Sequence, residues 1–211
     1  MDSDRKREID ADVRRRLESG DIEGATSVAL RAYGPEIFEF VAALHRNDAD
    51  ASEVFSLFAE KFWRNLKSFR WDASLRTWSY AVARSVSLDY RRAEKRRAAR
   101  IVPLPDASML SAIEAEVRTA TQSFLRTERR DRFAELRAQL PPDEQELLML
   151  RVDRQLAWDE LAVVLHGDGS PPLEGEAKKR VAARLRKRFQ HVKEKLYEMG
   201  RREGLVGRDD D

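Results

Sequence analysis

Apolar residues in the first third of the chain recur three and four positions apart, the spacing of one face of an α-helix. We expect a first such helix to begin near Pro35, because a proline in the first turn loses no hydrogen bond. Its apolar stripe is Ile37, Phe38, Phe40, Val41 and Leu44. A second, longer helix should follow, with Asp48 or Asp50 as its N-cap. Its stripe is Val54, Phe55, Leu57, Phe58, Phe62, Trp63 and Leu66.

A break in this spacing, FRWDAS at residues 69–74, precedes a third expected helix. The apolar positions of that helix are Leu75, Trp78, Val82, Val86 and Tyr90. The N-terminal residues 2–32 also have helical spacing, and we expect this extension to pack on the first domain. No segment alternates strictly between apolar and polar residues, and 9 glycines and 7 prolines are too few for a chain of many tight β-turns. The expected fold class is all-α.

The second half of the chain predicts a compact group of helices. One helix ends at the prolines 141 and 142, and the next begins with Asp143 and Glu144, where the helix dipole favours acidic residues. The expected core face of that helix is Leu147, Leu148, Leu150 and Val152. A short helix over about 157–165 and a long one over about 175–200 follow. The stripe of the long helix is Val181, Leu185, Phe189, Val192 and Leu196.

The segment between the two halves reads as a linker. Residues 91–100 hold six basic residues and one acid, and the prolines at 103 and 105 disfavour a continuous helix. We therefore predict a first domain over 1–94, a linker over 95–128, a second domain over 129–202 and a tail over 203–211. A short helix is expected within the linker, over 106–118.

Composition excludes several classes of protein. The chain has no cysteine, which rules out disulfides, thiolate metal sites and a cysteine nucleophile. Its three histidines are far apart, and we expect neither metal nor cofactor. No apolar run approaches a membrane span, and the N-terminus has no signal-peptide pattern, so we expect a cytoplasmic protein. No nucleophile elbow, glycine-rich phosphate loop or HExxH motif occurs, so we do not expect an enzyme.

The long last helix carries the clearest functional signal. Nine basic residues and one acid lie between Lys178 and Lys195. Long basic and amide side chains around two alanines suit a helix that enters the DNA major groove. The residues expected to face DNA are Lys178, Lys179, Ala182, Ala183, Arg186, Lys187 and Gln190. Basic runs alone favour the alternative of a solvated helix surface, but the short helix and turn that precede this one favour a helix-turn-helix.

The break at 69–74 carries a second signal. Phe69 and Trp71 flank Arg70 in an expected loop between two helices. Core packing does not readily explain large aromatic residues in such a loop. Aromatic rings beside arginine provide stacking platforms for unpaired bases. The alternative, a loop packed onto its own domain, is equally compatible with these residues. Acidic residues along the second helix also indicate a surface for a basic protein partner, a weak signal because helix surfaces usually carry both signs.

Two stretches together resemble a known family. Residues 33–92, from YGPEIFEF to SLDYRR, are similar to region 2 of the bacterial sigma-70 family. Residues 140–189, LPPDEQELLMLRVDRQLAWDELAVVL and later AKKRVAARLRKRF, are similar to region 4. The order and spacing resemble the extracytoplasmic-function (ECF, group 4) sigma factors. The turn between the last two helices, at 166–174, is longer than this family's usual three or four residues.

The resemblance implies an alternative sigma factor that brings core RNA polymerase to promoters. The clamp helices of the largest polymerase subunit would be bound by Asp50, Glu53, Val54, Leu57 and Glu60. The −10 DNA would be bound by Phe69, Arg70, Trp71, Ser74, Arg76, Thr77, Trp78, Arg84, Arg91 and Arg92. The basic last helix would read the −35 element, and the linker would thread toward the polymerase channels. An anti-sigma factor is a further possible partner.

Two other functions fit parts of the chain. A stand-alone helix-turn-helix regulator explains residues 140–200 but assigns no role to the aromatic residues between 69 and 78. A helical protein-interaction module would show no dependence on DNA. Tight duplex binding without polymerase would favour the first, and activity that survives charge reversal at Arg186 and Lys187 would favour the second.

Overall fold

The computed structural model describes residues 3–45, 47–97, 132–166 and 173–205. These residues form helices and connecting turns without a strand, which confirms the all-α prediction. The chain divides into two compact units, Met1–Ser123 with Val163–Pro172 and Phe124–Ala162 with Leu173–Asp211. Within the described ranges, no helix is both long and apolar enough to cross a membrane.

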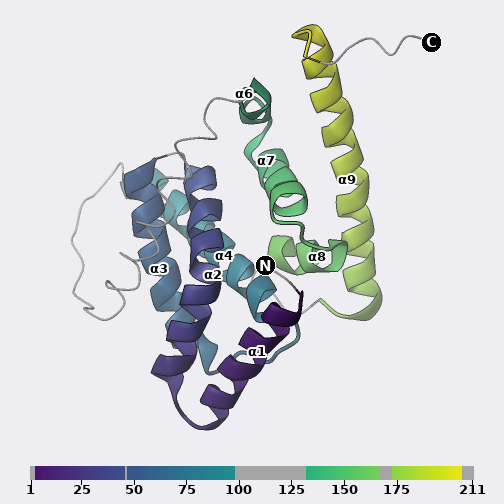
Figure 1. Ribbon diagram of the computed structural model, residues 1–211. Helices are drawn as coiled ribbons and strands as arrows, with labels where there is room; N and C mark the ends of the chain where they lie inside the picture. Colours follow the sequence, from purple (N-terminus) through teal and green to yellow (C-terminus); the bar gives the residue numbers. More distant parts are fainter. Residues whose placement is uncertain (1–2, 46, 98–131, 167–172, 206–211) are drawn as a thin grey trace. The chain divides into compact units, whose positions relative to one another are not determined.

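The first unit contains α1 (Ser3–Glu18), α2 (Ile22–His45), α3 (Asp48–Leu66) and α4 (Leu75–Arg97). Helix α2 lies beside α1 and α3, and α4 packs against both α2 and α3 (Figure 1). Aromatic side chains fill the space between α2, α3 and α4, and edge-to-face contacts join Phe38 to Phe55 and Phe40 to Tyr80. The buried large side chains of this core are Tyr33, Ile37, Phe40, Phe55, Phe58, Phe62, Leu66, Leu75 and Tyr80.

Helix α2 begins at Ile22, so the prediction of a helix start at Pro35 was wrong. Pro35 lies inside α2, where it cannot donate a hydrogen bond to the carbonyl four residues before it. The helix continues because apolar residues on both sides of the proline are buried. The start signal lies earlier: Gly20 has a φ of 81°, and Asp21 accepts a hydrogen bond from the Gly24 N–H at 2.9 Å.

The N-cap of α3 is Asn47, which corrects the expectation of Asp48 or Asp50. Asn47 has extended backbone, with φ −133°, and its side chain accepts a hydrogen bond from the Ala49 N–H at 2.9 Å. Asp48 and Asp50 instead occupy the first turn, where their negative charge interacts favourably with the helix dipole. All three residue types suit a cap, so the sequence alone did not distinguish between adjacent positions.

The second unit contains α6 (Arg132–Ala138), α7 (Pro142–Leu148), the π-helical turn η1 (Met149–Asp153), α8 (Trp158–His166) as far as Ala162, and α9 (Gly175–Arg202). Helix α9 packs along α6 and α7 (Figure 1). Leu140, Leu148 and Val192 form a buried cluster, which Phe189, Leu196 and Met199 extend. The expected apolar stripe of the last helix therefore does face the core.

The π-helical turn changes which residues face that core. The Arg154 N–H donates to the Met149 carbonyl, five residues back, at 2.9 Å. The wider turn rotates the following residues relative to an α-helix. Val152 is consequently 43% exposed, against the prediction that it lies on the core face, and Leu156 is buried.

Three expected features lie wholly or mostly outside the described residues. They are the linker over 95–128, the short helix over 106–118 and the long turn over 166–174, of which only the ends are described. The predicted domain boundaries that depend on them stay predictions.

Candidate functional site

The loop between α3 and α4 is built around stacked aromatic rings. The Phe69 ring stacks on the Trp78 ring with centroids 4.7 Å apart and an angle of 21° between the planes. The Trp71 ring lies 4.9 Å from Phe69, and Trp78 in turn lies 4.9 Å from the buried Phe62. The rings of the loop are half-buried. The loop therefore packs on its own domain, as the alternative interpretation expected, while keeping part of its aromatic surface accessible.

A side-chain cap fixes the point where this loop becomes α4. The Ser74 hydroxyl accepts a hydrogen bond from the Thr77 N–H at 3.1 Å and lies 2.8 Å from the Thr77 hydroxyl. Thr77 is buried in the free chain, and the DNA contact expected at this residue stays a prediction. Arg70 remains exposed and pairs with Asp72 of the same loop, at 3.3 Å.

Arg76 is also inside the domain rather than on its surface. Its guanidinium makes two hydrogen bonds of 2.8 Å to the Glu36 carboxylate of α2, and it lies 5.3 Å from the centre of the Tyr80 ring. The residue is 7% exposed. A planar guanidinium matches a carboxylate in this two-point geometry. In the free chain Arg76 thus forms a structural ion pair between α2 and α4, and the DNA contact expected at this residue stays a prediction.

The three arginines predicted further along α4 occupy different environments. Arg91 donates to the Leu44 carbonyl at 2.5 Å and so satisfies a backbone group near the end of α2. Arg92 is exposed and pairs with Asp89 at 3.3 Å. Arg84 is half-buried. Arg92 is thus the most accessible of the three.

The α3 residues predicted to bind polymerase do not all share one surface. Val54 is fully buried in the free chain, and its contact with polymerase stays a prediction. Asp50 accepts a hydrogen bond from the Tyr90 hydroxyl at 2.8 Å. Burial, followed by this hydrogen bond, raises the pKa of Tyr90 to about 12. Glu53 is exposed, and Leu57 and Glu60 are partly exposed.

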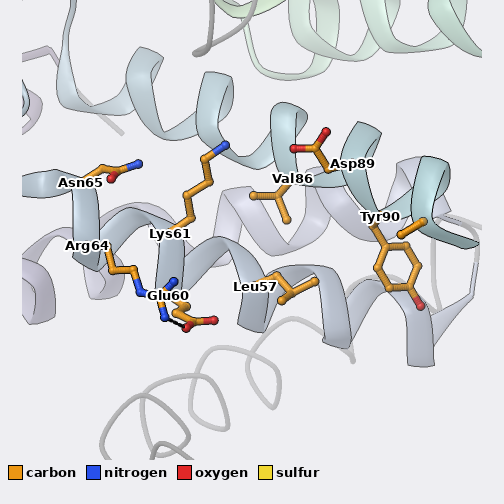
Figure 2. Close-up of a pocket in the computed structure, with 9 residues that line it drawn as sticks. Leu57, Glu60, Lys61, Arg64, Asn65, Val86, Asp89 and Tyr90 are labelled. Atoms are coloured by element: carbon orange, nitrogen blue, oxygen red, sulfur yellow. Dashed lines mark hydrogen bonds and ion pairs between the residues drawn. The ribbon is translucent and has the colours of Figure 1, made fainter. Parts of the chain in front are cut away.

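Leu57 and Glu60 border a groove between α3 and α4 with a volume of about 450 Å³ (Figure 2). Figure 2 shows the aliphatic side chains of Leu57 and Val86 inside this groove and the ion pair between Glu60 and Arg64 at its edge. The other lining residues are Lys61, Asn65, Asp89, Tyr90 and Ala93. An apolar floor with charged edges is suited to a helix that carries both kinds of side chain.

Most of the predicted DNA-facing residues of α9 are exposed. They are Lys179, Ala183, Arg186, Lys187 and Gln190, with Lys178 partly exposed. Ala182 is the exception: it is 4% exposed, so its predicted place on the polar face was wrong. Ala182 sits at the edge of the apolar stripe, where the small side chain allows close packing.

The Trp158 ring of α8 makes cation–π contacts with two arginines of the second unit. The Arg151 guanidinium lies 4.7 Å and that of Arg186 5.5 Å from the ring centre, and Phe189 contacts the same ring edge-to-face at 5.5 Å. Arg186 is therefore positioned by a cation–π contact.

Acidic residues of α7 neutralise part of the basic helix. Asp143 pairs with Arg188, and Glu144 pairs with Lys195 at 3.0 Å. The hydrogen bond from Arg188 lowers the pKa of the Asp143 carboxyl. The helix dipole is the only role for these acids that the sequence indicates, because residues about 50 positions apart give no pairing signal.

The described residues include no group of three histidine, aspartate or glutamate side chains that could hold a metal ion. The candidate functional surfaces of the first unit are thus the aromatic loop and the groove, and the candidate surface of the second unit is the exposed face of α9.

A comparison with known proteins finds a match within the first unit. Residues 29–97 match the family model of sigma-70 region 2. The match supports a sigma-70 family sigma factor. It covers most of α2, all of α3 and α4, the aromatic loop and every residue of the groove. No curated protein matches the chain. A sigma region 2 domain supports a role in transcription initiation and implies binding to core RNA polymerase.

Proposed function

We propose that the chain is an alternative sigma factor of the extracytoplasmic-function group that directs core RNA polymerase to promoters with specific −10 and −35 elements. The observation that carries this proposal is the region 2 match over the residues that build the aromatic loop and the groove. The exposed basic face of α9 in the same chain adds a second nucleic-acid surface. Together they provide for two separate DNA elements.

Core polymerase would bind along α3. Glu53 and Glu60 supply negative charge, and Leu57 supplies apolar contact at the adjacent groove. Val54 acts indirectly, because its burial fixes the helix on the domain. A partner helix with basic residues and one apolar ridge would complement this surface. An anti-sigma factor that covers the same residues would compete with polymerase.

The aromatic loop would capture an unpaired base of the −10 element. Extruding a base from the duplex costs a few kcal/mol, and stacking on an aromatic side chain returns about 1–3 kcal/mol per base. Phe69, Trp71 and Trp78 provide rings, and Arg70 provides an exposed cation beside them. Arg84, Arg91 and Arg92 lie further along α4, where Arg92 is the best placed to contact a phosphate.

Helix α9 would read the −35 element in duplex DNA. Arg186 and Gln190 can form two-point contacts with base edges, while Lys179 and Lys187 neutralise phosphates. Trp158 would hold Arg186 in one orientation before DNA arrives, which lowers the ordering cost of binding.

The test begins with the full chain and core RNA polymerase of the source organism. We expect stable co-purification and new, discrete start sites in run-off transcription on genomic fragments. Glu53→Lys should weaken core binding, because it reverses an exposed charge on α3. Glu8→Lys makes the same change on the exposed surface of α1 and should not.

Failure of the folded, inhibitor-free protein to bind its cognate core would refute the proposal. Tight binding to duplex DNA in the absence of polymerase would then support a stand-alone regulator. Activity that depends on neither DNA nor polymerase would support a protein-interaction module.

A further inference from the structure

Helix α1 precedes the residues that match sigma-70 region 2, yet two of its side chains reach the loop between α3 and α4. Asp10 and Arg14 are four residues apart in α1 and therefore lie on the same face of the helix. Val13, beside them, is fully buried and anchors this part of α1 to the first unit. Contact between α1 and the loop is thus part of the packed domain.

Asp10 joins three helices at the base of the loop. Its Oδ1 accepts a hydrogen bond from the Tyr33 hydroxyl of α2 at 3.0 Å. Its Oδ2 accepts one from the N–H of Leu75, the first residue of α4, at 3.3 Å. Burial raises the pKa of Asp10, while both hydrogen bonds oppose this shift. A carboxylate at this position satisfies a free N–H at the start of α4 and interacts favourably with the helix dipole.

Arg14 contacts the loop directly. Its guanidinium lies 5.7 Å from the centre of the Trp71 ring, within the range of a cation–π contact. Trp71 has a φ of 62°, a left-handed conformation that is rare for a bulky residue. Such strain persists only where surrounding contacts hold the residue in place. For Trp71 those contacts come from Phe69 on the loop and Arg14 on α1.

We propose that α1 is part of the machinery that captures the −10 base, with Asp10 and Arg14 as positioning residues for the aromatic loop. Asp10 fixes the end of the loop at α4, and Arg14 fixes the orientation of the Trp71 ring. A base that stacks on the loop then meets a prearranged surface. This inference rests on the proposed function, because it concerns the same DNA strand.

The experiment uses holoenzyme assembled from the full chain and core polymerase. The probe is a fluorescent single-stranded oligonucleotide that carries the non-template −10 sequence of a promoter mapped by run-off transcription. Arg14→Ala should weaken oligonucleotide binding about two- to fivefold, the factor expected for one exposed cation–π contact. Asp10→Ala should weaken it about threefold or more, as for loss of a helix cap. Binding to core polymerase should be unchanged in both variants.

Two comparisons separate positioning from other roles. Arg15→Ala removes the same charge from the same helix, where Arg15 pairs with Asp12, and should leave oligonucleotide binding unchanged. In a Trp71→Leu background, Arg14→Ala should have no further effect, because Arg14 acts through the ring that is already missing. If Arg14 instead contacted a phosphate directly, the losses of oligonucleotide affinity caused by Arg14→Ala and by Trp71→Leu would be additive.

Wild-type affinity of the Arg14→Ala holoenzyme, or additive losses in the Trp71→Leu background, would overturn the inference while leaving the proposed function intact. If wild-type holoenzyme itself fails to bind the oligonucleotide, base capture by this loop is refuted, and the role of α1 in it falls at the same time. The two failures are therefore distinguishable.

Discussion

The ion pair between Arg76 and Glu36 gives the most direct test of the boundary between structural and DNA-binding residues. Their side chains are 9% and 22% exposed, and two hydrogen bonds of 2.8 Å join them. Removing one partner of a buried pair costs about 3–5 kcal/mol, because the other charge stays buried without compensation. The partial exposure of Glu36 places the expected loss for Arg76→Ala near 3 kcal/mol. For a domain of this size that corresponds to a fall in Tm of about 12–24 °C.

Urea unfolding followed by tryptophan fluorescence measures this loss. In a Trp158→Phe background the remaining tryptophans all lie between residues 63 and 78, so the signal reports on the first unit alone. Replacing both Arg76 and Glu36 with methionine should recover most of the stability, because a matched apolar pair leaves no buried charge. Arg64→Ala, which breaks the exposed pair with Glu60, is the control and should cost less than about 1 kcal/mol.

Two results would refute this reasoning. One is an Arg76→Ala variant that unfolds at the same urea concentration as the parent but loses affinity for −10 DNA, which would place the arginine at the DNA surface. The other is a double methionine variant no more stable than Arg76→Ala, which would show that the pair does not act as a unit.

Three further predictions concern single side chains. Burial and the nearby Arg91 charge lower the pKa of His45 to about 4, below the value near 6.5 of an unfolded chain. Because the unfolded chain then binds a proton more readily than the folded one, the folded protein should lose about 2 kcal/mol of stability as pH falls from 6.5 toward 4. His45→Gln should flatten this pH dependence in urea titrations. Trp158→Ala should destabilise the second unit by roughly 2 kcal/mol in urea unfolding followed by far-UV circular dichroism, because the remaining tryptophans report on the first unit alone, and an unchanged midpoint would argue against its packing role. Asp143→Ala should change stability by less than about 1 kcal/mol, because both partners of its ion pair are partly exposed; a larger loss in calorimetry would contradict that estimate.

Helical periodicity predicted most of the elements correctly because the apolar stripes of α3, α4 and α9 face a core. The caps were harder. Asparagine and aspartate side chains are equally able to cap a helix, and only the extended backbone of Asn47 and its hydrogen bond from the Ala49 N–H distinguish it from Asp48 and Asp50. Pro35 was read as a start signal because a proline inside a helix is unfavourable, but burial on both sides outweighs that cost.

The sequence predicted which residue types gather at the candidate site better than it predicted which of them are exposed. Phe69, Trp71 and Trp78 do come together, since they flank one short loop. Arg76 and Thr77 directly follow that loop, but the helix turns them toward the core. A family resemblance places residues along the chain, and it does not show which face of a helix each side chain occupies.

Contacts between distant parts of the chain had no sequence signal. The approach of Asp10 to Leu75 spans 65 positions, and that of Arg188 to Asp143 spans 45. Charged residues occur on every helix, so their pairing depends on how the helices pack. The π-helical turn likewise exposed Val152 through a local change of register that apolar spacing does not encode.

The acidic residues of α7 form ion pairs with basic residues of α9 and so take the place of salt anions there. A basic helix that binds duplex DNA displaces salt cations from the phosphates, and each neutralised phosphate contributes about 0.9 to the slope of log affinity against log salt. Arg188 and Lys195 already hold Asp143 and Glu144, so they can reach phosphates only by breaking those pairs. Lys179 is paired in the same way with Glu176 of its own helix, so six of the nine basic residues between 178 and 195 are left for DNA. The salt slope from α9 is thereby limited to about −5 rather than −8, so affinity falls less steeply with salt than the charge of the sequence suggests.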